Sequence, residues 1–390
     1  MNMKSLLVVG GTGVISYAVV QEALKQNYKV TCINRGKSKN QTISSEVELI
    51  IADYHDGSII KSKLEGRHFD AVLDILCFSE KDIEYSISLF KDHCSQYLFF
   101  SSAEAYNKPK YKDIAYNENA ELSNPLWAYS VNKAKCEKKL IELASKLSLT
   151  YTIIRPAITY GNTRIPYGLM PPYGYHGTII QRIIHNKPIL LWDGGKAIAT
   201  ITRVEDFAIG LVGLLGNPKA YNQAFHIVGD DAYSWKDVID TLGSILDKEP
   251  IYCDVPCEFL ADELVDYKEQ LLGGRAISQR LDNSKLKSVV PNFKAKIHLK
   301  EGIQMTVNYY QRNHYLSGID WAFDANMDRL VRKWCNKNKI DVTKYNLSFI
   351  DYLGNVTVRD RFLYFLELHK DNFFVGIIKK VRSFILFSLR

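Results

Sequence analysis

The sequence predicts an α/β fold: a Rossmann-like, doubly wound parallel sheet with a smaller C-terminal α/β lobe and an extra C-terminal helical tail. A short apolar run, Leu6 to Val9, is followed at once by three closely spaced glycines. The next stretch, Val14 to Gln26, has apolar residues at helical spacing. Short apolar runs then alternate with amphipathic segments, which is typical of parallel strands joined by crossover helices.

Composition favours a globular protein. Of the 390 residues, 46% are hydrophobic and 24% are charged, so we do not expect disorder. The formal net charge of +7 is too evenly spread to indicate nucleic-acid binding, but it is compatible with anionic phosphosugars or a membrane surface. The seven cysteines have no metal-ligand spacing, which predicts reduced thiols and no metal site. The chain enters its first strand without a signal segment and has no run of about 18 apolar residues, so we expect a cytoplasmic protein.

The glycine turn predicts a dinucleotide-binding site. A strand, a glycine-rich turn and a helix in this order bring backbone N–H groups and the positive end of the helix dipole to a pyrophosphate. A glycine-rich turn alone is weak evidence, but here the strand and the helix flank it. The expected contacts are Gly10, Thr12, Gly13, Val14 and Ile15.

The second strand, Lys29 to Asn34, indicates which dinucleotide is bound. The ribose is met by a residue about 20 positions beyond the glycines, and here that place falls near Asn34. An acidic residue there would repel a 2′-phosphate, whereas the neutral Asn34 followed by Arg35 favours one. We therefore expect NADP somewhat more than NAD, although the same charges would also suit a solvated loop. The third strand, Glu48 to Ala52, ends at Asp53, which could reach the adenine.

Three further apolar runs predict strands, and two amphipathic stretches predict helices. The strands are Asp70–Leu76, Gln96–Phe100 and Tyr151–Arg155, and the helices are Asp82–Lys91 and Leu126–Leu147. In a parallel sheet of this kind, ligands lie beyond the carboxyl ends of the strands. Gly10, Asn34 and Ser102 all lie at such ends.

Tyr129 and Lys133 supply the second chemical signal. They are four residues apart in the second of these helices, so they share one helix face with Cβ atoms about 5–6 Å apart. A tyrosine with an ordinary pKa of about 10 is a poor base at neutral pH, but a fixed ammonium beside it favours the phenolate. Such a tyrosine can move a proton to or from a sugar hydroxyl while hydride moves to or from a nicotinamide. The Tyr-x-x-x-Lys motif is short and occurs by chance. It becomes informative here because it follows a glycine turn and a strand-end serine in this order.

In these motifs the chain resembles the extended short-chain dehydrogenase/reductase family, in its nucleotide-sugar epimerase/dehydratase branch. The matching segments follow the family's order: Gly10–Ser16, Phe100–Tyr106, Tyr129–Lys133, Arg155–Gly161, Trp192–Gly195, Val204–Ala208 and Ala224–Gly229. The resemblance implies that Ser102, Tyr129 and Lys133 are catalytic. It also implies a bound NAD or NADP, a nucleotide-sugar substrate beneath the smaller lobe, and a homodimer.

Two departures from the family pattern bear on the reaction. Ser16 stands where the family has its third glycine, and it is small enough to keep the helix close to the strand. Ala103–Glu104 stands where the dehydratases have Asp–Glu, and an alanine cannot protonate a leaving hydroxyl. The sequence therefore favours an epimerase that oxidises its sugar transiently and reduces it again. Glu104 either touches the sugar, acts as a base beside a carbonyl, or is only a polar residue at a strand end.

Two other kinds of function stay open. An NADPH-dependent keto-sugar reductase, or a dehydratase-like enzyme, of surface-polysaccharide sugar biosynthesis would use the same residues. A nucleotide-sensing or RNA-binding protein on the same fold would not need Ser102, Tyr129 and Lys133. The sequence also lacks the concentrated basic patch that RNA binding favours.

Four arginines are candidates for binding the substrate phosphates. Arg164 opens a loop rich in proline, glycine and tyrosine that runs to Tyr175 and could form a lid. Arg182, Arg203 and Arg275 lie in segments that resemble the family's later contacts. For each of them, a surface ion pair is the simpler alternative.

We expect a dinucleotide-binding domain over residues 1–175, a substrate-binding lobe over 176–318 that is interleaved with the first domain in space, and a helical extension over 319–390. Within the extension, Trp321–Lys337 has helical periodicity. The last stretch, Phe373–Arg390, combines an apolar helical face with the cations Lys379, Lys380, Arg382 and Arg390. A basic amphipathic helix can lie in a membrane interface, here at the inner face of the membrane, or it can dock on the enzyme or on a second subunit.

Overall fold

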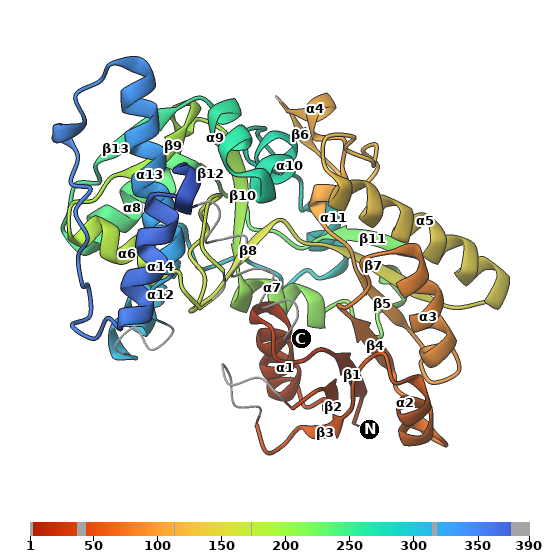
Figure 1. Ribbon diagram of the computed structural model, residues 1–390. Coiled ribbons are helices and arrows are strands. Elements are labelled where there is room, and N and C mark those ends of the chain that lie inside the picture. Colours follow the sequence, from red (N-terminus) through yellow and green to blue (C-terminus); the bar gives the residue numbers. More distant parts are fainter. Residues whose placement is uncertain (1–2, 37–43, 113, 173, 314–317, 376–390) are drawn as a thin grey trace.

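A computed structural model describes residues 3–36, 44–112, 114–172, 174–313 and 318–375. Its larger lobe is a seven-stranded parallel sheet in the order β11-β7-β5-β4-β1-β2-β3 (Figure 1). The strands are β1 (Ser5–Val9), β2 (Lys29–Asn34), β3 (Glu48–Ile51), β4 (Ala71–Asp74), β5 (Tyr97–Phe100), β7 (Tyr151–Arg155) and β11 (Gln223–His226). This order confirms the predicted Rossmann-like, doubly wound sheet, whose strand sequence reverses direction between β1 and β4.

Helices cover both faces of this sheet, as its buried central strands β1, β4, β5 and β7 require. Leu6 and Val8 of β1 pack on the face covered by α1 (Val14–Lys25) and α7 (Val204–Val212). Leu7 and Val9 face the other way, toward α2 (Gly57–Leu64), α3 (Glu80–Phe90) and α5 (Ala128–Leu147). Since successive side chains of a strand point to opposite faces, a continuous apolar run is what a strand between two helix layers needs.

The second lobe has its own core. Its strands are β8 (Ile158–Tyr160), β9 (Ile189–Trp192), β10 (Ile198–Arg203), β12 (Ala232–Ser234) and β13 (Tyr252–Val255), and its helices include α6 (Gly177–Ile184), α8 (Trp235–Leu246), α9 (Cys257–Glu263) and α12 (Leu299–Arg312). Trp192 and Trp235 lie at the centre of this core. The short strands β8, β9 and β13 were not predicted, because three- or four-residue apolar runs give little periodicity.

The C-terminal extension packs on this second lobe. Helix α13 (Trp321–Asn338) follows the predicted bounds within one residue and contributes Met327, Leu330 and Val331 to the lobe's core. Its outer side pairs with α14 (Val358–Leu368), an unpredicted helix (Figure 1, blue). Most of the predicted tail helix, residues 376–390, lies outside the described residues.

Candidate active site

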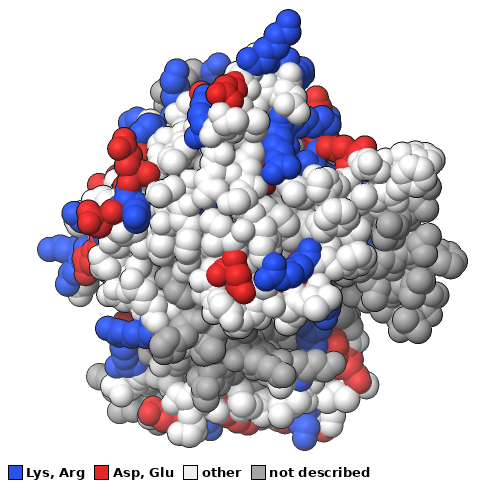
Figure 2. Space-filling model, turned by 60° about the vertical axis from the view of Figure 1, so that its left-hand side comes forward, with Lys and Arg blue, Asp and Glu red and all other residues white. Residues whose placement is uncertain are grey.

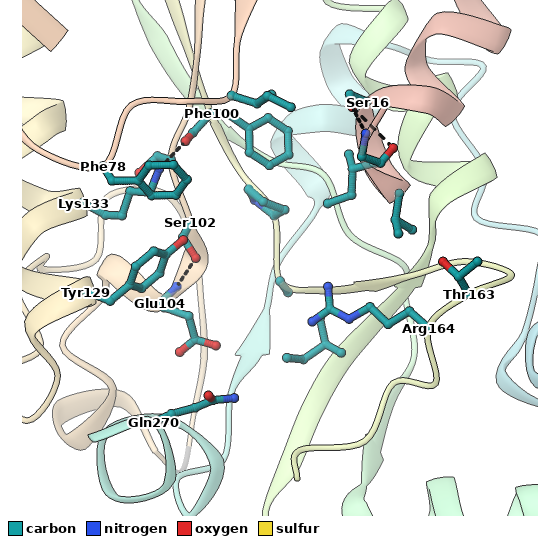
Figure 3. A pocket seen from close by; sticks show the side chains of 18 of the residues that line it. Ser16, Phe78, Phe100, Ser102, Glu104, Tyr129, Lys133, Thr163, Arg164 and Gln270 are labelled. Atoms are coloured by element: carbon teal, nitrogen blue, oxygen red, sulfur yellow. Dashed lines mark hydrogen bonds between the residues drawn. The ribbon is translucent and has the colours of Figure 1, made fainter. Parts of the chain in front are cut away.

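A pocket of about 960 Å³ lies between the two lobes, and side chains of both lobes line it (Figure 3). Ser102, Glu104 and Tyr129 lie on one side, and Ser16, Thr163 and Arg164 lie across from them. Further lining residues are Thr12, Gly13, Val14, Ile15, Phe78, Lys133, Gln270, Arg275 and Tyr310. This volume is at the upper end of the range for a small-molecule site.

The glycine turn has the backbone geometry that its sequence predicts. Gly10 has φ +87°, which disfavours any residue with a side chain. A Cβ atom on Gly11 would come within 2.6 Å of Cys32 Sγ. Ser16, in place of the third glycine, donates from Oγ to Gly10 O at 2.7 Å and accepts from Gly13 N at 3.0 Å. Its hydroxyl therefore bridges the two ends of the turn.

The residues around this turn fit a dinucleotide. Thr12 to Ile15 line the pocket where the first turn of α1 has N–H groups without intrahelical partners. At the end of β2, Asn34 accepts from Gly36 N through Oδ1, while its buried Nδ2 has no hydrogen-bond partner among the described residues. An orphaned donor at this place suits a ribose hydroxyl or phosphate oxygen. Asn34, Arg35 and Asp53 do not line the pocket, and Arg35 and Asp53 are exposed.

The structure distinguishes the two serines that follow β5. Ser101 Oγ donates to Glu137 at 2.5 Å, and Glu137 in turn binds the guanidinium of Arg155, so this serine serves the buried framework. Ser102 begins the short turn Ala103–Ala105, where its Oγ accepts from the N–H of Glu104 at 3.1 Å. The hydroxyl of Ser102 thus lies at the pocket. Its oxygen accepts a hydrogen bond from Glu104, and its O–H group can donate one to a bound ligand.

Lys133 is fixed behind Tyr129 by backbone carbonyls. Its Nζ donates to Cys77 O, beyond the end of β4, at 2.7 Å and to Phe100 O, at the last residue of β5, at 2.8 Å. It lies 5.9 Å from the centre of the Tyr129 ring and 4.6 Å from that of Phe78. Burial lowers the pKa of this ammonium. The expected helical spacing therefore does bring tyrosine and lysine to one pocket wall.

Glu104 forms a buried cluster with two cations. Its carboxylate lies 2.5 Å from Lys108 Nζ and 2.9 Å from Arg275 Nη1. Burial alone would raise the pKa of Glu104, but the charges of Lys108 and Arg275 hold it below its ordinary value. Arg275 is itself held by its carbonyl oxygen, which accepts from the indoles of Trp192 and Trp235. Glu104 is therefore an ionised carboxylate at the pocket wall.

Two of the four expected phosphate-binding arginines do not reach the pocket, and this corrects the sequence prediction. Arg182 is fully buried and binds Asp324 at 2.7 Å and Asp328 at 3.0 Å, both on α13. Arg203 is also fully buried, where its guanidinium binds Glu205, Asn162, Gly302 O and Thr306. Both guanidinium groups already have their acceptors inside the protein, so they hold the second lobe together.

Arg164 and Arg275 do line the pocket. The loop that Arg164 opens is not the surface lid that its composition suggested. Residues 165–169 are buried, Tyr167 donates to Leu190 O at 2.7 Å, and a Cβ atom on Gly168 would meet Trp192 at 2.7 Å. Only the ends of this loop face the pocket.

Sequence reasoning missed two residues that support the pocket wall from behind without lining it, Lys108 and Glu269. Lys108 follows Glu104 by four residues, a spacing that could have suggested the ion pair. Glu269 accepts from Ala128 N at 2.7 Å and so holds the start of the tyrosine helix from the second lobe. No local pattern could have found that contact, since 141 residues separate its partners.

The fold and the pocket together define a class: a Rossmann-fold protein with a dinucleotide-type turn and a serine, tyrosine and lysine set on one pocket wall. More specifically, the chain belongs to the NAD dependent epimerase/dehydratase family, whose model matches residues 6–227, and it is an enzyme of that class.

Individual relatives within this family are distant. The chain is 28% identical over 239 residues to a chloroplast stem-loop binding protein of 41 kDa from Arabidopsis thaliana, covering 58% of this chain and 59% of that protein. It is 24% identical over 281 residues to a UDP-glucose 4-epimerase from Vibrio cholerae, covering 64% of this chain and 80% of that protein. Among solved structures, UDP-glucuronic acid 4-epimerase from Bacillus cereus in complex with NAD superposes with a TM-score of 0.61 at 18% identity, covering 79% of this chain and 99% of that one. At these identities the structural likeness shows the fold alone.

Proposed function

We propose that this chain is a nucleotide-sugar epimerase. It oxidises a sugar hydroxyl transiently, the keto-sugar rotates within the pocket, and the enzyme then reduces the keto group from its other face. One observation carries the proposal. Ser102 and Tyr129 line the same pocket as the N-terminal turn of α1, so a group that binds sugar oxygen and a turn that binds dinucleotide phosphates share one space.

In this reaction Tyr129 would take the proton of the reacting hydroxyl and return it during reduction. Ser102 would donate a hydrogen bond from its hydroxyl to the same sugar oxygen. Lys133, held by two carbonyls behind Tyr129, would favour the phenolate through its charge. Residues 12–15 would hold the pyrophosphate of NAD or NADP, and Asn34 the ribose; the bound nicotinamide supplies the hydride acceptor.

The pocket lacks the acid that a dehydratase needs. Among the described residues that line it, Glu104 is the only one with a carboxyl group, and Ala103 stands beside it. Because Lys108 and Arg275 hold Glu104 ionised, this carboxylate has no proton to give to a leaving hydroxyl. An ionised Glu104 suits a base or a sugar contact better than an acid, and this supports epimerisation over dehydration.

The second candidate is an NADPH-dependent keto-sugar reductase. The neutral Asn34 with its unpaired Nδ2, followed by the exposed Arg35, favours a cofactor with a 2′-phosphate. A reductase would consume this cofactor at each turnover, whereas an epimerase would keep it. We also propose, from family resemblance, a homodimer and a location in the cytoplasm.

A nucleotide-sensing or RNA-binding role is the alternative outside catalysis. A match to a stem-loop binding protein keeps this alternative open, although it spans only 59% of that protein. Ser102, Tyr129 and Lys133 would have no purpose in such a protein.

The first experiment is mass spectrometry of the nucleotide released when the purified protein is denatured, followed by incubation with UDP-glucose and other UDP-sugars without added cofactor. Retained NAD or NADP and interconversion of two epimers would support the proposal. Oxidation of a UDP-sugar only with added NADP⁺, followed as a gain of reduced-nicotinamide absorbance because it runs the reductase reaction in reverse, would replace it by the reductase. No affinity for either dinucleotide would contradict both.

A further inference from the structure

An exposed aromatic face on the C-terminal extension is not used by the pocket. Val358, Phe362 and Phe365 recur on α14 at spacings of four and three residues, so they share one helix face. Phe373 and Phe374 follow just beyond the helix. The exposed fractions of these five residues, which we call the α14 face, range from 47% to 85%. Burying four phenylalanines would release substantial free energy, so leaving them in water is costly.

Cations border this face. Arg359 and Arg361 are exposed and flank it in helical projection. The carboxylates of this segment are engaged elsewhere. Asp360 caps its own helix by accepting from Thr357, Glu367 lies 3.9 Å from Lys370, and Asp371 binds Arg329 at 2.7 Å. Figure 2 turns the side with α13 and α14 toward the viewer and shows a broad area with few charged side chains.

The sequence that follows the α14 face has the same chemistry. Residues 376–390 comprise eight large apolar residues, four cations and no acidic residue. No helix among the described residues is long and apolar enough to cross a membrane. An apolar face bordered by cations and continued by a basic apolar segment is the composition that binds in the plane of a bilayer.

We infer that the α14 face docks on a lipid surface that carries anionic headgroups. The phenylalanines enter the acyl boundary, and Arg359 and Arg361 meet the lipid phosphates. A second copy of the chain fits this face less well. A two-fold contact would bring the cations of both copies together, while the nearby carboxylates Asp360 and Asp371 are already engaged within their own chain. This inference does not depend on the proposed epimerase activity.

The test is flotation of the full chain with vesicles of phosphatidylcholine alone and of phosphatidylcholine with phosphatidylglycerol. We expect binding to the anionic vesicles only, weakened by salt. The double substitution F362S/F365S should lower the bound fraction about tenfold, and F373S/F374S should act similarly. The matched control is I114S/V265S, which alters two apolar side chains that are 56% and 74% exposed elsewhere. It should float like the wild type, and all variants should keep the wild-type unfolding midpoint.

Three results would overturn the inference. The first is a wild-type chain that does not float with anionic vesicles. The second is equal loss of binding in the α14 variants and the control. The third is a concentration-dependent dimer that F362S/F365S abolishes while vesicle binding is absent, which would give the face to a second copy. Deletion of residues 376–390 should weaken flotation further, and unchanged flotation would limit lipid contact to the α14 face itself.

Discussion

Lys133 and Arg182 are both buried cations that the sequence predicts to be functional, yet the structure gives them opposite surroundings. The ammonium of Lys133 donates its hydrogen bonds to two backbone carbonyls, lies beside aromatic rings, and stands at the pocket wall. Arg182 meets two carboxylates from α13 and does not line the pocket. The charge of a cation whose direct partners are neutral can still stabilise a negative charge on a bound group. A cation that is paired with buried carboxylates has its charge neutralised and serves to hold the structure together.

The same contrast separates the two lobes. In the first lobe the candidate residues come from the ends of strands and the start of a helix, so the sheet itself brings them together. In the second lobe the arginines depend on residues far along the chain. Lys187 joins Arg182 in the same cluster, at 2.5 Å from Asp328, and Tyr352 and Tyr364 complete it from the extension.

The largest effect that we expect is a loss of turnover when the tyrosine beside Lys133 is changed. Replacing Tyr129 by Phe removes the proton acceptor but keeps the ring beside Lys133. We expect turnover to fall by about a thousandfold, because general acid–base groups contribute on that scale. Dinucleotide affinity and the unfolding midpoint should stay at the wild-type level. Steady-state kinetics with the nucleotide-sugar that the wild type converts, together with a dinucleotide titration, measure both quantities.

A Tyr129→Phe variant with wild-type turnover would show that the pocket wall is not catalytic. In that case the serine, tyrosine and lysine set would be as structural as Arg182. Ser101→Ala is a useful companion, because Ser101 also lines the pocket but its hydroxyl donates to Glu137.

The second prediction concerns the stability that the buried Arg182 cluster provides. Asp324→Ala leaves Arg182 and Lys187 buried with one carboxylate between them, and we expect the free energy of unfolding to fall by about 3–5 kcal/mol. Urea unfolding measures this. The matched control is Asp92→Ala, which breaks an exposed ion pair with Lys91 and should leave stability unchanged. Equal stability of the Asp324 variant would mean that the extension does not fasten the second lobe.

The comparison also explains what the sequence could and could not predict. Leu6–Val9, the glycines and the Tyr129–Lys133 spacing are local patterns, and the structure has the predicted strand, turn and helix there. The predicted helix at Trp321–Lys337 is confirmed for the same reason. The roles of Arg182 and Arg203 depend on partners about 100 or more residues away, and no spacing rule reports such partners.

Glu104 shares features of both sites, because it lines the pocket and is also paired with buried cations. The pH dependence of stability tests this pairing. Its folded-state pKa is depressed, so its contribution to stability is fully present above the ordinary value of 4.5 and is lost as the pH falls through the depressed pKa. At neutral pH, Glu104→Gln should lower the free energy of unfolding by about 2 kcal/mol, since it removes charge-assisted hydrogen bonds. The difference between wild type and variant should shrink as the pH falls below 4.5. A difference that is constant down to low pH would show that Lys108 and Arg275 do not hold the carboxylate ionised.

The smallest effect concerns Ser16, where the chain departs from its family inside the most predictable segment. Ser16→Ala removes the hydroxyl that bridges Gly10 O and Gly13 N, and the free energy of unfolding should fall by about 1 kcal/mol. Ser288→Ala is the matched control, because that serine donates to a backbone carbonyl at the surface of α11 (Ser284–Val289) and should change little.

The binding measurement decides what this bridge does. If Ser16 holds the glycine turn in its binding geometry, the alanine variant should bind dinucleotide more weakly as well as unfold more easily. Ser16→Gly restores the family's residue, yet it should also weaken binding, because it lacks the same hydroxyl. Wild-type affinity in both variants would show that the turn keeps its shape without the bridge, and that the serine is only a small residue tolerated where the helix approaches the strand.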